Sequence, residues 1–152
     1  MILNVGVGAG LFTTKRLGAD VVCDIDYPKQ KQENFVRCDA HHLPFRDKSF
    51  QLVYCHNVLE HVLDPWKVLR EMKRVGDHLN IRQDVWWSLG SYATPEHYWF
   101  QLPNLKFLPY PRTRPGIIFS KALRFVFMKF FAETLHFSVW INILSQRYEV
   151  NL

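Results

Sequence analysis

Short apolar runs that end in polar residues recur through the first half of this chain. Runs of this kind are typical of buried parallel strands. They predict strands over Ile2–Val5, Asp20–Asp26, Asn34–Ala40 and Phe50–Val58, and a fifth strand over residues 78–83. Each of the first four runs into a stretch that contains glycine, aspartate, histidine or asparagine, so polar chemistry gathers where the predicted strands end.

Helical periodicity replaces this pattern after Asp64. Asp64 is a suitable N-cap, and Pro65 suits the first position of a helix. The apolar residues then repeat at every third position and predict one apolar face, made of Trp66, Leu69, Met72 and Val75 with Val68 between them. A shorter helix is expected over Leu11–Leu17. Strands that alternate with helices predict an α/β fold with a mostly parallel central sheet.

The second half of the chain has a less regular pattern. Residues 84–116 are rich in aromatic residues and proline, which predicts an irregular excursion. A helix is expected over Ser120–Leu135, where apolar and basic residues fall on opposite faces. Two closing strands are expected over residues 137–144 and 147–152. The length predicts a single domain, residues 1–152, with a ligand-binding half (1–75) and a divergent closing half (76–152).

Composition indicates a folded protein and excludes several specialised classes. Of the 152 residues, 48% are hydrophobic and 15% aromatic, which is enough for a core. The net charge of +5 is spread along the chain without a lysine or arginine run, so a nucleic-acid surface has no support. Charged residues interrupt the apolar residues 116–144 before they reach a bilayer-spanning length, and no transmembrane segment is expected.

The three cysteines, Cys23, Cys38 and Cys55, lack the spacing of metal ligands. Each is expected to be a small buried apolar residue in a strand. No secretory signal is recognisable, so a reducing cytoplasmic environment is expected.

Polar residues follow each of the first four predicted strands. They are Gly6, Gly8 and Gly10, then Asp24 and Asp26, then Asp39, then His56 and Asn57. Since the carboxyl ends of parallel strands share one edge, these residues are expected to meet there. Glycines allow the backbone to approach a ligand closely, an acid after the second strand can bind ribose hydroxyls, and an acid after the third can bind an adenine amino group.

The glycine spacing distinguishes between ligands. A dinucleotide fingerprint requires a third glycine at position 11, which is Leu11 here, and the pattern is G-x-G-x-G instead. This disfavours a nicotinamide oxidoreductase. The glycines alone do not distinguish a loop that binds an adenosyl cofactor from a tight turn that binds no ligand.

Three stretches of the first half resemble class I S-adenosylmethionine-dependent methyltransferases of the type 11 kind: ILNVGVGAG, VVCDID and FVRCDAHHLPFRDKSFQLVYCHNVLEHVLDPWKVLREMKRV. The most specific part is D-A-x-x-L-P-F-x-D-x-S-F-x-L-V followed by V-L-E-H-V-x-D-P. The resemblance covers Met1–Val75, about half of the chain. It implies a Rossmann-like three-layer sandwich, reduced at the N-terminus because nothing precedes the first strand.

The resemblance implies S-adenosylmethionine as the cofactor and assigns the strand ends to its parts. The glycine loop would meet the methionine part, Asp24 the ribose, Asp39 and Ala40 the adenine, and His56 and Asn57 would line the methyl-transfer site. The predicted cofactor-binding residues are Asn4, Gly6, Gly8, Gly10, Asp24, Ile25, Asp39, Ala40 and His56. No metal is expected, and His41 and His42 are interpreted as loop residues at the cofactor rim.

The expected function is a methyltransferase (EC 2.1.1 class) acting on a small-molecule, glycan or lipid-precursor acceptor. Asn4 stands where the family usually has Asp or Glu, which alters the contact to the cofactor's amino group. This departure and the missing N-terminal cover keep an alternative open, a degenerate, non-catalytic cofactor-binding subunit that pairs with another chain. A nucleic-acid methyltransferase also stays open, although no N-P-P-Y-type motif is present.

Two histidines are candidates for a catalytic base, His56 at a strand end and His97 in a stretch that resembles a later D-P-x-H motif. Glu60 and His61 are expected to be an orienting pair behind the site. The aromatic residues of the excursion are expected to form either a substrate lid or a small second core: Trp86, Trp87, Tyr92, Tyr98 and Trp99. The helix over Ser120–Leu135 is expected to pack on the sheet, with peripheral membrane contact and a homodimer as further possibilities.

Overall fold

The computed structural model describes residues 1–6, 18–28, 31–84, 96–110, 118, 121–122, 125 and 147–152. They belong to two compact units. The first unit is Met1–Arg82 with Glu149–Leu152, and the second is Gln83–Tyr148. The first unit contains strands β1 to β4, whose carboxyl ends carry the polar residues singled out in the sequence.

A six-stranded sheet forms the first unit, in the order β3-β2-β1-β4-β5-β8. Its strands are β1 (Ile2–Val5), β2 (Val21–Asp24), β3 (Phe35–Arg37), β4 (Phe50–His56), β5 (Gly76–Asp84) and β8 (Arg147–Asn151). Strands β1 to β5 are paired in parallel. The predicted parallel α/β sheet is therefore confirmed, and so are its first five strands and the closing strand over residues 147–152.

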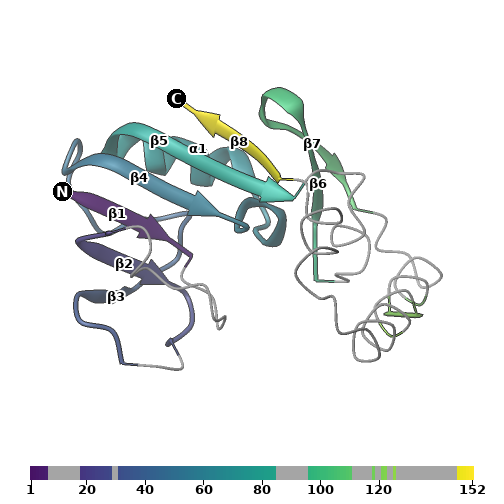
Figure 1. The fold of residues 1–152 in the computed structure, drawn as a ribbon, viewed down its shortest axis with the longest axis horizontal. Helices are drawn as coiled ribbons and strands as arrows, with labels where there is room; N and C mark the ends of the chain where they lie inside the picture. The colour runs from purple at the N-terminus through teal and green to yellow at the C-terminus, as the bar shows by residue number, and fades with distance from the viewer. Residues whose placement is uncertain are drawn as a thin grey trace, which may run out of the picture. The chain divides into compact units, whose positions relative to one another are not determined.

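Strand β8 runs against the direction of β5, as their arrows show in Figure 1. Leu79 and Leu152 exchange backbone hydrogen bonds in both directions, at 2.8 and 2.9 Å. This reciprocal pair is the pattern of an antiparallel ladder. The last residues of the chain therefore close the edge of a sheet that is otherwise parallel.

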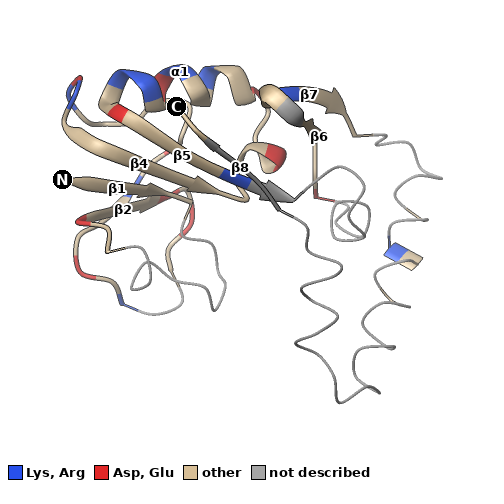
Figure 2. Ribbon diagram, turned by 45° about the horizontal axis from the view of Figure 1, so that its top comes forward, with Lys and Arg blue, Asp and Glu red and all other residues tan. Residues whose placement is uncertain are grey.

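Strand alternation gives the sheet one dry face, and α1 (Pro65–Val75) lies against that face in Figure 2. The inward residues of the strands are each at most 3% exposed: Leu3, Val5, Val53, Cys55, Leu79 and Ile81. Strand register pairs them with one another across β1, β4 and β5, and α1 adds buried Pro65, Val68, Leu69, Met72 and Val75. This layer is the core of the first unit.

The predicted cap of α1 is confirmed, whereas the prediction for Trp66 is wrong. Asp64 Oδ1 accepts a hydrogen bond from the Lys67 backbone N–H at 2.9 Å, and Pro65 opens the helix. Trp66 is 45% exposed. Trp66 and Val75 are nine positions apart, and at about 100° per residue this separation amounts to two full turns and a further half turn of the helix. Trp66 therefore lies on the side of the helix opposite Val75.

A clamp made by Arg74 joins α1 to the segment before β4. The guanidinium donates to the Leu43 and Phe45 carbonyl oxygens at 2.9 and 2.8 Å, and it bonds the carboxylates of Glu71 and Asp47 at 2.8 Å. Glu71 in turn accepts from the Leu43 backbone N–H at 2.9 Å. Several basic residues lie along α1 in Figure 2, and the contacts of Arg74 tie the loop to the helix.

The second unit contains a short hairpin where the sequence predicts an irregular excursion. Strands β6 (Trp99–Leu102) and β7 (Lys106–Pro109) pair antiparallel around the 3-10 turn η3 (Pro103–Leu105). Asn104 and Leu105 have φ of +62° and +55°, and these left-handed residues reverse the chain. The prediction missed the hairpin because its turn is built on Pro103 and Asn104 rather than on glycine.

Several predicted elements lie outside the described residues. They are the helix over Leu11–Leu17, Gly8 and Gly10 of the glycine loop, Trp86, Trp87 and Tyr92, and the strand over residues 137–144. Of the helix expected over Ser120–Leu135, only Lys121, Ala122 and Phe125 are described, and these are helical. The expected roles of these elements stay predictions.

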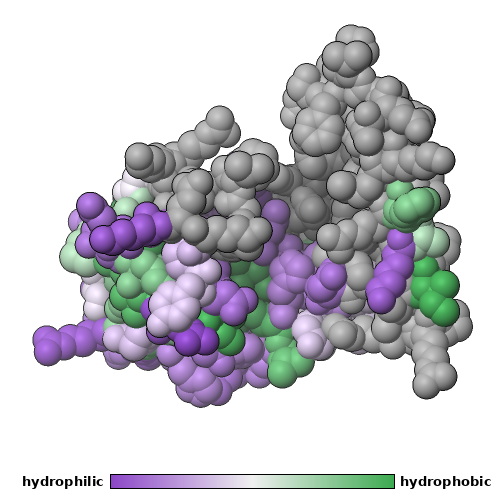
Figure 3. Space-filling view, turned by 90° about the horizontal axis from the view of Figure 1, so that it is seen from below, coloured by the Kyte–Doolittle hydropathy of each residue, from purple (hydrophilic) through white to green (hydrophobic). Residues whose placement is uncertain are grey.

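Among the described residues, no helix combines the length and apolarity needed to cross a membrane. Polar and apolar residues are intermixed on the face that Figure 3 displays. The large apolar side chains that are exposed in the first unit come from several parts of the chain: Met1, Ile25, Tyr27, Leu63, Trp66 and Leu152. Single exposed residues of this kind are normal on a protein surface.

We predict that Arg74→Met lowers the free energy of unfolding by about 2 kcal/mol, because it leaves two carbonyl oxygens and the Glu71 carboxylate without their donor. Arg70→Met is the matched control, since Arg70 is an exposed arginine of the same helix, and it should change stability by less than about 0.5 kcal/mol. Urea unfolding followed by circular dichroism measures both. Equal losses in the two variants would contradict the clamp.

Candidate functional site

The predicted polar clusters lie at one edge of the first unit's sheet. Gly6 follows β1, Asp24 ends β2, Asp39 comes two residues after β3, and His56 ends β4. Because these strands are parallel and paired in the order β3-β2-β1-β4, their carboxyl ends lie side by side. Ligands of open parallel sheets bind in the crevice outside this edge.

Strand β1 ends in a buried amide and a left-handed glycine. Asn4 is 5% exposed, and no described residue hydrogen-bonds its Oδ1. Gly6 has φ of +80°, and a Cβ at this position would lie 2.1 Å from Cγ2 of Val58. Only glycine fits, since a side chain would strain the backbone and overlap the loop after β4. An unpaired buried oxygen costs about 1–3 kcal/mol, so Asn4 suits an acceptor for a ligand's donor.

The end of β2 holds Asp24 at the sheet edge. Asp24 is half-buried, and its Oδ1 accepts from the Asp26 backbone N–H at 3.1 Å. The carbonyl oxygen of Ile25 accepts from Arg37 Nε at 2.9 Å, and the Arg37 guanidinium lies 4.9 Å from the centre of the Tyr27 ring. These contacts fix the chain that follows Asp24.

The end of β3 places Asp39 beside His41. Asp39 Oδ1 accepts from the His41 backbone N–H at 2.8 Å and from His41 Nδ1 at 2.6 Å. His41 Nε2 lies 3.2 Å from the Asp64 backbone N–H. Because that N–H can only donate, Nε2 is the acceptor and Nδ1 carries the proton. His41 therefore links the Asp39 carboxylate to the N-cap of α1, a contact that the rim interpretation of His41 did not include.

The same hydrogen bonds govern the ionisation of Asp39. Partial burial by itself would raise the pKa of this carboxyl, but the hydrogen bonds from the His41 backbone and ring outweigh it and hold the pKa below that of an ordinary aspartate. Asp39 is thus a carboxylate at neutral pH, with a side chain 48% exposed at the edge. Such a group suits a hydrogen-bond acceptor for a ligand's amino group.

The end of β4 places His56 next to Asn80 of β5. His56 Nε2 lies 2.8 Å from Asn80 Oδ1, and the His56 ring meets Tyr54 edge to face at 5.5 Å. The next residue, Asn57, has φ of +55° and donates its backbone N–H to the Arg82 carbonyl oxygen at 2.8 Å. Strand β4 therefore turns away from the sheet directly after His56.

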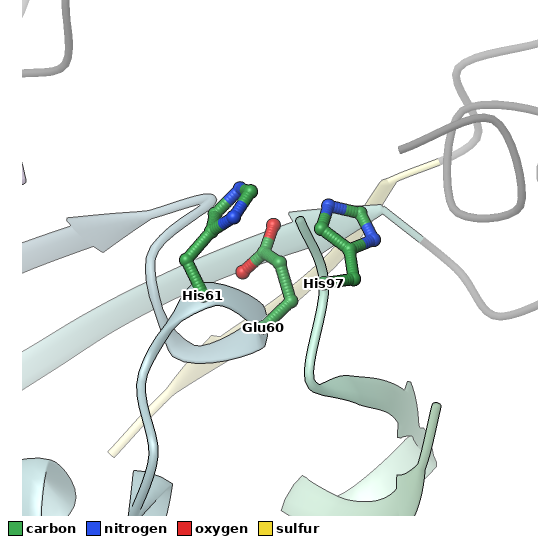
Figure 4. A group of neighbouring side chains, drawn as sticks. All are labelled: Glu60, His61 and His97. Carbon is green, nitrogen blue, oxygen red and sulfur yellow. The ribbon is translucent and has the colours of Figure 1, made fainter. Parts of the chain in front are cut away.

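Glu60 and His61 lie on the 3-10 turn η2 (Leu59–His61), just beyond the predicted methyl-transfer residues. Glu60 is buried and His61 is exposed. The Glu60 carboxylate and the His61 ring lie side by side in Figure 4, with ligand atoms within 4.8 Å of each other. Burial and the Glu60 carboxylate raise the pKa of the neighbouring Cys55 thiol, so Cys55 stays protonated.

His97 belongs to the second unit and is described within it. The residue is buried, and its ring meets Tyr110 edge to face at 6.2 Å, while Phe100 lies 4.8 Å from Tyr110 on a tilted plane. Tyr98 and Trp99 are half-buried. The rings of His97, Phe100 and Tyr110 form a small aromatic cluster, and a catalytic role for His97 stays a prediction.

The prediction for the cysteines holds for Cys23 and Cys55, which are buried in β2 and β4. It is wrong for Cys38, which is half-buried and follows β3. Cys23 and Cys38 share a thiol–thiol hydrogen bond, which raises the pKa of Cys23 and lowers the pKa of Cys38. Cys38 is therefore a polar contact partner at the end of β3 and not a core residue.

Asn80 is the residue near this edge that sequence reasoning missed. The alternation of HLNIRQ places His78, Asn80 and Arg82 on one face of a strand, but alternation alone does not name a neighbour. The parallel register, which pairs Tyr54 with Asn80 and His56 with Arg82, brings Asn80 diagonally against His56. That register is a tertiary property.

A protein-family model described as "Methyltransferase domain" matches residues 3–78 of this chain. An "Uncharacterized methyltransferase" of Mycobacterium sp. (strain KMS) is 34% identical over 84 residues, which cover 49% of this chain and 33% of that protein. An uncharacterized protein of Methanocaldococcus jannaschii is 35% identical over 80 residues, covering 49% of this chain and 35% of its own length. The chain thus matches about a third of the length of these curated relatives.

Among solved structures, the fold is similar to an S-adenosylmethionine-dependent methyltransferase of Thermotoga maritima, described as a possible histamine N-methyltransferase. The TM-score is 0.51 at 21% identity, over 57% of this chain and 45% of that chain. At this identity the likeness concerns the fold. It agrees with the mostly parallel sheet of the first unit.

We predict that His41→Ala raises the pKa of Asp39 toward the ordinary value, because the ring hydrogen bond that lowers it is removed. NMR titration of the Asp39 carboxyl carbon measures the shift. His42→Ala is the comparison variant: His42 acts on Asp39 through its charge alone, the smallest of the causes, and its ring lies 2.7 Å from Lys67 Nζ, so this variant should raise the Asp39 pKa less than His41→Ala does. An Asp39 pKa that is the same in His41→Ala and wild type would contradict the geometry.

The sign of the linked stability effect follows from the lowered pKa. A carboxyl with a depressed folded-state pKa stabilises the protein above its unfolded pKa and loses this contribution as the pH falls through its folded value. The stability difference between wild type and His41→Ala should therefore be largest above about pH 4 and shrink below it.

Proposed function

The chain belongs to the class I methyltransferase family, and on this basis we propose that it transfers a methyl group from S-adenosylmethionine to a small-molecule, glycan or lipid-precursor acceptor. The observation that carries the proposal is the buried, unpaired Oδ1 of Asn4, which lies on the strand whose end joins the polar edge. The family match supports an enzyme rather than a non-catalytic subunit. A cytoplasmic location stays a prediction.

The described residues fit the parts of this cofactor. Asn4 Oδ1 would accept from the ammonium group of the methionine part, Asp24 from the ribose hydroxyls, and Asp39 from the adenine amino group, with Ala40 beside the ring. Gly6 lets the loop after β1 approach closely without a side chain. A neutral amide in place of the family's usual acid still offers an oxygen acceptor, and it avoids burying a charge in the protein without ligand.

When bound, S-adenosylmethionine supplies a methyl group already activated by its sulfonium, for in-line transfer to an acceptor. The chain's own task is therefore to position the two reactants and to keep water out. We propose that His56 removes the proton from an oxygen or nitrogen acceptor, because it ends β4 at the same edge as the cofactor residues. His97 is the further candidate for contact with the acceptor.

Calorimetric titration with S-adenosylmethionine and S-adenosylhomocysteine tests the proposal. We expect binding with a Kd in the roughly micromolar range and no binding of NADH. Asp24→Ala should weaken both ligands about tenfold or more, because it removes hydrogen bonds to a charged acceptor. Asp77→Ala is the matched control, since Asp77 is exposed near the start of β5, where the parallel strands begin, and it should leave binding unchanged. Folded wild-type protein that binds neither adenosyl ligand would overturn the proposal and favour a non-catalytic chain that needs a partner to complete the pocket.

The Asn4→Leu variant distinguishes two roles for Asn4, one as a hydrogen-bond acceptor for the ligand and one as an amide needed for the fold. The substitution conserves shape and removes an oxygen that is unpaired without ligand, so the stability of the protein alone should change by less than about 1 kcal/mol. Affinity for S-adenosylmethionine should fall about tenfold, because the ammonium loses its acceptor. Thermal unfolding with and without ligand measures both. A large loss of stability with unchanged affinity would show that Asn4 is structural.

A further inference from the structure

A row of polar side chains crosses the face of the sheet that is turned away from α1. Asn4 of β1 is in register with Tyr54 of β4, and Tyr54 is in register with Asn80 of β5. Leu79 and Leu152 exchange backbone hydrogen bonds and so lie opposite each other in an antiparallel pair. The residue after Leu79, Asn80, therefore lies opposite the residue before Leu152, Asn151. The row is therefore a consequence of register across strands that are far apart in the sequence.

Two hydrogen bonds connect the outer part of this row to His56. Asn80 Nδ2 donates to Asn151 Oδ1 at 2.7 Å, and His56 Nε2 lies 2.8 Å from Asn80 Oδ1. A carbonyl oxygen only accepts, so Nε2 carries a proton. A neutral His56 then has its lone pair on Nδ1. The chain of contacts thus runs from β8 through β5 to the end of β4.

We propose that Asn80 is a positioning residue for methyl transfer, holding His56 as the Nε2–H tautomer, and that Asn151 keeps the Asn80 amide in the orientation this requires. Without Asn151, the amide could turn and present Nδ2 to the ring, which would favour the other tautomer. The functional role of this arrangement rests on the proposed function, whereas the hydrogen-bond arrangement itself does not.

This arrangement decides which ring nitrogen takes the proton. With S-adenosylmethionine bound, the methyl group would pass from sulfur to the acceptor's oxygen or nitrogen, the electron pair of the S–C bond would stay on sulfur, and His56 Nδ1 would take the acceptor's proton. The imidazolium that forms donates a stronger, charge-assisted hydrogen bond from Nε2 to Asn80 Oδ1. A carboxylate in place of Asn80 would stabilise the imidazolium before the reaction, whereas an amide orients the ring without adding charge.

Nitrogen-15 NMR of the histidine rings tests the proposal on the protein alone. His56→Gln assigns the His56 signals among the seven histidines, at a pH of about 8, where an ordinary histidine is neutral. We expect protonated Nε2, unprotonated Nδ1 and a slowly exchanging ring N–H in wild type. Asn80→Leu should speed exchange of that proton about tenfold, and Asn80→Asp should retain its protection. Protonated Nδ1 in wild type, or unchanged exchange in Asn80→Leu, would overturn the proposal.

Two further variants keep the test informative if Asn80→Leu does not fold. Asn151→Ala should accelerate exchange of the His56 ring proton, although Asn80, the partner of His56, is still present. An exchange rate equal to that of wild type in this variant would overturn the role of Asn151. Tyr54→Phe is the matched control, since Tyr54 packs against the same ring, and it should leave exchange unchanged. Accelerated exchange in Tyr54→Phe equal to that in Asn80→Leu would mean that general packing, not Asn80, protects the proton.

Calorimetry separates this proposal from the proposed function. Asn80→Leu should bind S-adenosylmethionine within about twofold of wild type, because Asn4, Asp24 and Asp39, which are proposed to hold the methionine, ribose and adenine parts, lie on or after strands beyond β4 from Asn80. A large loss of affinity in this variant would overturn a pure positioning role. Absence of binding in wild type, together with the expected ring spectra, would refute the proposed function and leave the positioning of His56 by Asn80 established.

Discussion

Parallel pairing of β1 with β2 on one side and β4 on the other is the constraint on which the first unit depends. It sets a single direction for the strands, so every loop that follows a strand opens at the same edge. It also brings the end of β1 so close to the loop after β4 that Gly6 has no room for a Cβ beside Val58. The glycine is required by this contact even before any ligand is considered.

The same pairing separates the sheet into two chemically different faces. Leu3, Val53 and Leu79 are in register and buried against the side of α1, which gives a dry layer. The residues between them carry amides and rings on the opposite face. A strand alternates its side chains by necessity, so one register produces both the core and the polar row. A shift of one residue would exchange them.

Helix α1 does more than cover the sheet, because it holds both ends of the segment between β3 and β4. Near the beginning of that segment, the N-cap backbone bonds His41, which in turn bonds Asp39. Near its end, Arg74 bonds the carbonyl oxygens of Leu43 and Phe45. The helix thereby orients a carboxylate at the sheet edge.

The sequence alone was enough for the strands β1 to β5, for the cap of α1 and for the shared edge of Gly6, Asp24, Asp39 and His56. These follow from local rules, because apolar runs, caps and glycines act over a few residues. The wrong prediction for Trp66 shows the limit of a three-residue spacing. Each step of three residues falls short of a full helical turn, so positions several steps apart lie on different sides of the helix. The β6–β7 hairpin was missed because its turn uses left-handed Asn104 and Leu105 instead of glycine. The link from His41 to Asp64, and the link from Asn151 through Asn80 to His56, were decided by tertiary structure. They join residues whose distance in space depends on strand order and register, and no spacing along the chain encodes that distance.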